Sequence, residues 1–331
     1  AINRVRLQAE PDERNASFRA ASLVLAERVF SGHKGDTAGR VALIGQSHID
    51  MAWLWPARET KLKCAATMAN TFSLQDRYPL YHFSHSQAQG FQWLKDNNPH
   101  LFSRVKRAVK AGRIQIVGGM WVEADLNCSG GEPLARQFLY GQRFFERNFG
   151  VRSNVGWLID TFSYNWSLPQ ILKEAGIDYF VSTKPTWNDT NVFPFTTFWW
   201  EGPDGSRVMT HVPTLSYGHD IGTEKIVTTL ERNREPWLGV SPMALYGKSD
   251  GGGGPRVGDV EMIKRIEKSP YAPQVTVTTP QDWFDSVAKD IPCPVYCDEM
   301  YLELHRGTYT TQARTKRNNR KAECGLYAAE V

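Results

Sequence analysis

A histidine and an aspartate stand two residues apart just after a short apolar run. Val41 to Ile44 are all apolar, Gly45 follows, and His48 and Asp50 come next. The run predicts a buried strand of an α/β sheet. Residues two apart on an extended backbone point to the same side, so His48 and Asp50 can direct an imidazole nitrogen and a carboxylate oxygen to one point. This is half of a metal site, although an isolated His-x-Asp pair is more often only hydrogen-bonded.

A further carboxylate ends another predicted strand. Asp160 closes the stretch from Asn154 and precedes an aromatic turn. Alone, such a residue is more often a helix cap or a solvated loop residue than a catalytic group. Trp53 and Trp55 follow the first pair directly and are candidate apolar walls of a cleft.

The elements that must position these groups alternate along the chain. Helical periodicity and apolar runs predict helices at 16–30, 57–74, 99–111, 132–148 and 168–175, and strands at 41–44, 80–85, 113–117, 154–160, 179–183, 197–201, 207–212, 243–247 and 274–278. This alternation predicts an α/β fold with a mostly parallel sheet and helices on its faces. Many polar and aromatic residues follow the strands, which predicts a polar cleft at their carboxyl ends. They are His48, Asp50, Ser86, Gln87, Trp121, Glu123, Asp125, Asp160, Lys184, His211, Asp220 and Asp250.

Composition excludes several classes. The 331 residues are 41% hydrophobic and 22% charged with a net charge of +4, as in an ordinary globular protein. The basic cluster 314–321 is better explained as a solvated helix face than as a nucleic-acid patch. No run approaches the ~20 apolar residues of a membrane span, and charges throughout 1–20 argue against a signal peptide. Five cysteines, an odd number, favour reduced thiols and a cytoplasmic location.

Three stretches together resemble glycoside hydrolase family 38, the α-mannosidases. They are Gln46–Trp53, Asp160 in its Trp-x-x-Asp-x-Phe setting, and 303–311 with its Leu-His-Arg-Gly-Thr-Tyr-Thr-Thr run. The last stretch and the glycine-rich 250–255 point to the cytosolic and bacterial branch. The resemblance runs from about residue 39 to the end of the chain. It implies an irregular, mostly parallel β/α barrel-like domain with flanking helices, followed by the start of a helical bundle.

The resemblance also implies a domain division. We expect a leading helical segment at 1–35, an α/β catalytic domain at 36–292, and an extended segment with a truncated helical domain at 293–331. The basic helix after residue 312 still continues at Val331, and Leu326, Tyr327 and Val331 would be apolar positions without packing partners. We therefore expect a fragment of a longer protein.

The resemblance implies one zinc ion held by His48, Asp50, Asp160 and His305, a ligand set that suits zinc with open positions. The ion would take two adjacent sugar hydroxyls. Asp160 would also be the nucleophile of a retaining, double-displacement mechanism, which needs a second carboxylate as acid and base. For that role Asp220 is the first choice and Asp250 the second.

Residues that would contact the sugar follow from the same likeness. Trp53 would stack beneath the ring, where an aromatic face suits the apolar side of a pyranose; the less favoured alternative is a core tryptophan. Further candidates for binding hydroxyl groups are His211, Tyr217, Arg306 and Tyr309. The expected substrates are mannose-containing oligosaccharides, and downstream domains would allow a homo-oligomer.

Two other functions stay open at this point. A zinc polysaccharide deacetylase-like hydrolase would use an aspartate as a base for metal-bound water rather than as a nucleophile. A noncatalytic carbohydrate-binding fragment would bind mannosides without turnover. An aspartate placed among three other metal ligands favours the enzyme, because a lectin has no use for it.

Overall fold

Short parallel strands joined by helices build most of the chain, as the alternating pattern predicts. The computed structural model describes residues 10–30, 39–287 and 291–331. The helices are α1 (Pro11–Phe30), α2 (Ala57–Arg77), α3 (Ala88–Asn97), α4 (Pro99–Lys110), α5 (Gly131–Phe149), α6 (Leu168–Glu174), α7 (Thr223–Glu231), α8 (Val257–Lys268), α9 (Pro280–Ser286) and α10 (Ala313–Glu330). The strands are β1 (Arg40–Gly45), β2 (Phe83–His85), β3 (Ile114–Ile116), β4 (Val155–Trp157), β5 (Tyr179–Val181), β6 (Thr197–Glu201), β7 (Arg207–His211), β8 (Met243–Tyr246), β9 (Gln274–Val277) and β10 (Val295–Tyr296).

The strands form three sheets, ordered β8-β1-β9, β10-β6-β7-β5-β4 and β2-β3. All neighbouring pairs are parallel except β6 and β7. A single parallel bridge between Gln46 and Ser84 connects the ends of β1 and β2, and Gly118 N–H donates to Val155 C=O at 2.8 Å between the ends of β3 and β4. The predicted mostly parallel sheet is therefore a mixed set of three, and closure into a barrel stays a prediction.

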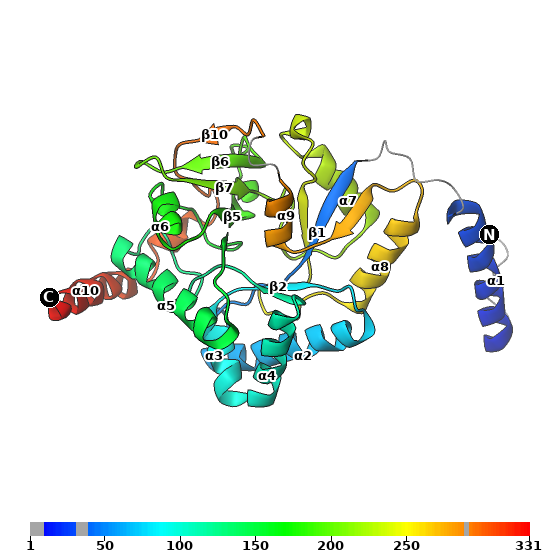
Figure 1. The fold of residues 1–331 in the computed structure, drawn as a ribbon, viewed down its shortest axis with the longest axis horizontal. Coiled ribbons are helices and arrows are strands. Elements are labelled where there is room, and N and C mark those ends of the chain that lie inside the picture. The colour runs from blue at the N-terminus through cyan, green and yellow to red at the C-terminus, as the bar shows by residue number, and fades with distance from the viewer. Residues whose placement is uncertain (1–9, 31–38, 288–290) are drawn as a thin grey trace.

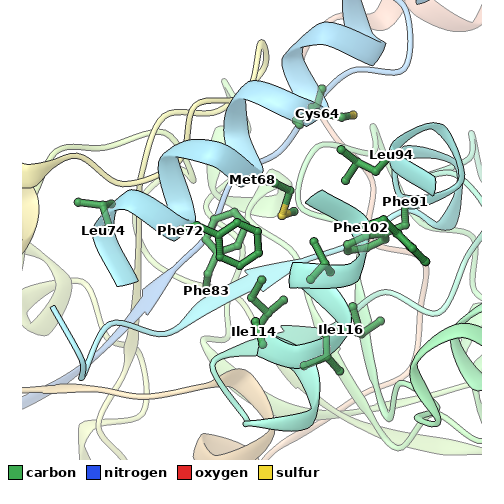
Figure 2. Close-up of a cluster of buried hydrophobic side chains, with 14 of the residues drawn as sticks. Cys64, Met68, Phe72, Leu74, Phe83, Phe91, Leu94, Phe102, Ile114 and Ile116 are labelled. Carbon is green, nitrogen blue, oxygen red and sulfur yellow. The ribbon is translucent and has the colours of Figure 1, made fainter. Parts of the chain in front are cut away.

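Helices α2, α3 and α4 cover the β2-β3 sheet with an aromatic core (Figure 2). Phe72 of α2, Phe91 of α3 and Phe102 of α4 are all buried, as is Phe83 of β2. Burying a large apolar side chain contributes about 1.5–3 kcal/mol. This core holds the ends of β2 and β3 in place, and the segments that follow these two strands reach the site described below.

Predicted and observed elements agree best where the apolar pattern is strong. Strand 197–201 matches β6, and helix 132–148 differs from α5 by one residue at each end. The helices α3, α7, α8 and α9 were not expected. Helix α1 begins at residue 11 instead of 16, and residues 31–35 of the predicted leading segment lie outside the described residues.

The two terminal helices lie at opposite ends of the molecule in Figure 1. No residue of α10 is buried, and Leu326 and Tyr327 are exposed. The start of a helical bundle stays a prediction. Within the described residues, no helix is both long and apolar enough to cross a membrane.

Gly141 in α5 lets this helix contact the segment that follows β3. A Cβ at this position would lie 2.2 Å from Gly119 O and 2.7 Å from Trp121 N. We therefore expect Gly141→Ala to lower the free energy of unfolding by about 1–3 kcal/mol, as overpacking does. Urea denaturation measures this. Gly131→Ala is the control, because no atom lies within 4 Å of its Cβ, and equal stability of the two variants would contradict the close approach.

Candidate active site

The segment after β1 is held by hydrogen bonds to the loops that follow β7 and β8. Gln46 Nε2 donates to Tyr217 C=O at 2.6 Å, and Ser47 Oγ donates to Lys248 C=O at 2.8 Å. Asp50 N–H donates to Asp250 C=O at 2.9 Å. These bonds fix the backbone on both sides of His48, so the side chains of this segment have defined directions.

The glycine run after Asp250 makes this pairing possible. Asp250 itself has φ of 58°, and Gly252, Gly253 and Gly254 all have positive φ, which residues with side chains rarely adopt. A Cβ on Gly252 would lie 2.6 Å from Thr67 Oγ1. The run is thus a tight turn packed on α2 that presents Asp250 beside the strand carrying His48 and Asp50.

His48, Asp50 and Asp160 form a cluster suited to a metal ion. One ligand atom from each lies within 4.8 Å of the others. His48 Nε2 is 3.5 Å from Asp50 Oδ1 and 3.2 Å from Asp160 Oδ2. This nitrogen is buried and has no hydrogen-bond partner, which is costly unless a cation or proton joins the group. The donor set therefore fits a metal such as zinc, with one imidazole and two carboxylates.

His305, the fourth predicted ligand, lines the same cavity but is not part of the three-residue cluster. It is exposed, has φ of 50°, and its ring centroid lies 5.3 Å from that of Phe162. The antiparallel bridge between Tyr164 and Met300 brings this carboxyl-terminal segment alongside the turn after Asp160. Its role as a ligand stays a prediction.

The charges of the cluster are coupled. Burial raises the pKa of Asp160, but His48 and Lys184 outweigh it and hold this pKa at about 2. Burial lowers the pKa of His48, yet Glu123, Asp160 and Asp50 together raise it well above its usual value. Asp160 is therefore a carboxylate at neutral pH, as a metal ligand or a nucleophile must be.

A cavity of about 880 Å³ contains this cluster. Of the predicted site residues, His48, Asp50, Trp53, Asp160, Tyr217, Asp250, His305 and Tyr309 line it. Tyr217 O–H donates to Asp250 Oδ1 at 2.9 Å. Trp53 is 60% exposed and contacts Trp55 edge-to-face with ring centroids 5.2 Å apart, so a face of its ring is open to a ligand.

Three predicted residues lie outside the cavity, which is a correction to the sequence analysis. The Asp220 side chain is 67% exposed and pairs with Arg256, because its segment turns outward toward α8. Arg306 is also exposed and forms a two-bond ion pair with Asp189, each bond 2.9 Å long. His211 is completely buried, as are the three residues before it on β7, and its ring packs against buried Trp283.

His211 has a structural role. Its Nε2 accepts the N–H of Met243 at 3.0 Å, and its Nδ1 lies 2.9 Å from Thr197 Oγ1. It thus links β7 to β8 and to β6. Burial lowers its pKa from 6.5 to about 3, so the ring is neutral at ordinary pH and does not face a substrate.

This burial predicts acid sensitivity. The unfolded chain protonates His211 below about pH 6.5, whereas the folded protein resists until about pH 3, so the unfolded state binds more protons between these values. The free energy of unfolding should therefore fall with falling pH in this window, by up to ~1.4 kcal/mol per pH unit from this group. Urea titrations at several pH values measure the slope. We expect His211→Gln to flatten it, whereas the exposed His100→Gln should not; equal slopes would contradict the assignment.

Two residues of the site, Glu123 and Lys184, were not assigned a catalytic or binding function from the sequence. Glu123 has a buried carboxylate, 5% exposed, with Oε2 3.1 Å from His48 Nδ1. Lys184 is 1% exposed and pairs with Asp160, and its Nζ lies 3.4 Å from the ring centroid of Trp187. The position of Glu123 and Lys184 after predicted strands was the available signal, but it did not separate them from surface residues.

The family follows from comparison with known proteins. The model described as "Glycosyl hydrolases family 38 N-terminal domain" matches residues 38–305. The chain therefore belongs to glycoside hydrolase family 38, which confirms the resemblance given by its motifs.

Similar individual proteins support the same family assignment. The chain is 41% identical over 304 residues to alpha-mannosidase G of Dictyostelium discoideum, with 91% of this chain and 28% of that protein covered. It is 41% identical over 310 residues to human alpha-mannosidase 2C1, with 93% of this chain and 30% of that protein covered. The crystal structure of an alpha-mannosidase from Enterococcus faecalis V583 has the same fold, with a TM-score of 0.63 at 20% identity over 79% of this chain and 31% of that one. The chain thus spans less than a third of the length of these proteins.

Proposed function

We propose that the chain carries the catalytic site of a zinc-dependent retaining α-mannosidase that removes terminal α-linked mannose from glycans. The observation that carries this proposal is the joint placement of the His48, Asp50 and Asp160 cluster with Asp250 in one cavity. Membership of family 38 and the alpha-mannosidase relatives support the substrate class.

In this proposal, His48, Asp50 and Asp160 hold the zinc ion, and His305 is the fourth ligand. Bound zinc would act as a Lewis acid toward two adjacent sugar hydroxyl groups and help to orient the ring. The exposed face of Trp53 would support the apolar side of the same sugar. The low pKa of Asp160 keeps its carboxylate ionised and ready to react.

The bond-breaking steps are assigned to two carboxylates. Asp160 attacks the anomeric carbon while the glycosidic bond breaks, and Asp250 donates a proton to the departing oxygen. Asp250, now ionised, then takes a proton from the water that releases the sugar from Asp160. Asp250 is preferred to Asp220 because it lines the cavity and its carboxylate accepts a hydrogen bond from Tyr217, whereas Asp220 pairs with Arg256 outside it.

A mannosyl fluoride with a second fluorine on the ring tests the function directly. The fluorine slows release of the sugar, so a retaining enzyme should gain the mass of one fluoromannosyl group, and peptide mapping should place it on Asp160. A deacetylase-like hydrolase or a noncatalytic binding fragment would form no such adduct. An unmodified protein that binds zinc and mannosides would end the proposal.

The contribution of Trp53 to sugar binding can be measured separately from that of the carboxylates. We expect Trp53→Ala to lower kcat/KM for an aryl α-mannoside by roughly 2- to 13-fold, equivalent to the ~0.5–1.5 kcal/mol that aromatic contacts contribute beyond burial. Trp237→Ala is the matched control, since this tryptophan is 71% exposed and lies outside the cavity. If both variants lose the same activity, Trp53 has no direct contact with the sugar.

The proposed setting is cytoplasmic, with mannose-containing oligosaccharides as substrates. All five cysteines are free, which suits a reducing compartment. A homo-oligomer assembled through further domains is part of the same proposal. We assign no nucleic-acid or membrane partner.

A further inference from the structure

Both ring nitrogens of His48 face carboxylates, and the two sides differ. Nε2 faces the cluster, 3.5 Å from Asp50 Oδ1 and 3.2 Å from Asp160 Oδ2. Nδ1 faces away from it, 3.1 Å from Glu123 Oε2. A neutral imidazole carries one proton, so the nitrogen that binds a metal must be the one without it.

Glu123 is held in place independently of His48. Its Oε1 accepts the hydroxyl proton of Ser86 at 2.6 Å, and its backbone N–H donates to Gln87 Oε1 at 3.1 Å. Gln87 Nε2 in turn donates to the carbonyl of Ile49 at 2.9 Å. Ile49 lies between His48 and Asp50, so this network returns to the segment that carries both of these residues.

The side chains that hold Glu123 beside His48 are buried, so water does not compete for their hydrogen bonds. Ser86 and Gln87 are 3% and 4% exposed, and the Glu123 side chain is 5% exposed. Gln87 also has φ of 66°, an uncommon conformation for a residue with a side chain. A buried carboxylate is costly unless its oxygens are matched. Here Ser86 donates to Oε1, whereas Glu123 Oε2 and His48 Nδ1 have no other hydrogen-bond partner among the described residues and face each other at 3.1 Å.

We propose that Glu123 is a positioning residue for the metal centre: it holds the proton of His48 on Nδ1 and thereby keeps Nε2 free and aimed at the ion. The inference rests on the metal site of the proposed function and adds a determinant of its affinity. Carboxylates behind a histidine ligand fix the tautomer and raise its basicity, and their loss lowers metal affinity about 10- to 100-fold.

Competition with a chromophoric chelator measures the zinc affinity of the purified protein. We expect Glu123→Ala, which removes both charge and acceptor, to weaken zinc binding roughly 10- to 100-fold. Glu123→Gln keeps an acceptor oxygen, so its zinc affinity should lie between that of Glu123→Ala and that of the wild type. Asp125→Asn is the local charge control and should bind zinc like the wild type, because its Oδ1 can still accept the N–H groups of Asn127 and Cys128.

Nitrogen-15 NMR of the His48 ring supplies a readout independent of activity. With zinc bound, the wild type should show a protonated Nδ1 and a metal-bound Nε2, and zinc-loaded Glu123→Ala should show an Nδ1 signal shifted by the loss of its acceptor. Ser86→Ala, which frees Glu123 without removing it, should weaken zinc binding by a smaller factor and guards against misfolding of the Ala variant. Zinc binding by the Glu123 variants within about twofold of the wild type would overturn the inference. A wild type that binds no zinc would instead remove the metal centre itself.

Discussion

Asp160→Asn should reduce kcat for mannoside hydrolysis by about 10⁴- to 10⁶-fold, the scale seen when a covalent nucleophile is removed. The variant keeps the size and one oxygen of the side chain but cannot form the glycosyl-enzyme ester. It also loses the negative charge that pairs with Lys184 and faces His48. Steady-state kinetics with an activated aryl α-mannoside, together with zinc analysis of the variant, measure both effects.

The metal measurement separates the two roles of Asp160. If the variant retains zinc and loses activity, the loss belongs to the chemical step. If it loses both, adding excess zinc should restore occupancy without restoring turnover. Asp189→Asn is a suitable control, because Asp189 forms an exposed ion pair with Arg306 outside the cavity. An Asp160→Asn variant with near-normal kcat would exclude the double-displacement mechanism on this residue.

Asp250→Asn should reduce kcat/KM for unactivated disaccharides by about 10²- to 10⁴-fold, the usual contribution of general acid catalysis. The same substitution should have a smaller effect on aryl mannosides with a good leaving group, because their oxygen departs without a proton. With such substrates the slow second step should let the glycosyl-enzyme accumulate as a burst. Added azide, which needs no base, should then release mannosyl azide with retained configuration.

Asp220→Asn is the decisive comparison for the acid. Asp220 pairs with Arg256 in solvent, and exposed ion pairs contribute little to stability. We therefore expect activity close to that of the wild type on both kinds of substrate. Loss of activity in Asp220→Asn with normal activity in Asp250→Asn would reverse the assignment.

Much of the fold was predictable from local pattern. The apolar run at 41–44 and the strand at 197–201 are strands in the structure, and the helix predicted at 99–111 is α4. These segments carry enough periodicity to define their elements alone. Helix α8 was missed beside the glycine run, although Val260, Ile263 and Ile266 recur at helical spacing and Asp259 completes a capping box at its start.

Some site residues were predictable from their spacing in the sequence and from the order of the motifs that contain them. His48 and Asp50 are two apart on extended backbone, so their convergence follows from strand geometry. Their likeness to family 38 then points to Asp160, although no local rule places it beside them. The structure brings these three together through β1, β4 and their flanking loops.

The family, the β-α alternation and the three clustered residues His48, Asp50 and Asp160 were predictable from the sequence, because they depend on local periodicity and on motifs in a fixed order. Which of the remaining polar residues face the cavity depends on long-range contacts and was visible only in the structure. His211 lies at the end of a predicted strand, and Asp220 and Asp250 follow predicted strands, but side-chain direction at a strand end depends on long-range packing and hydrogen bonds. The same long-range contacts place Glu123 behind His48, a pairing across 75 residues that no spacing reveals, since it depends on how two loops meet.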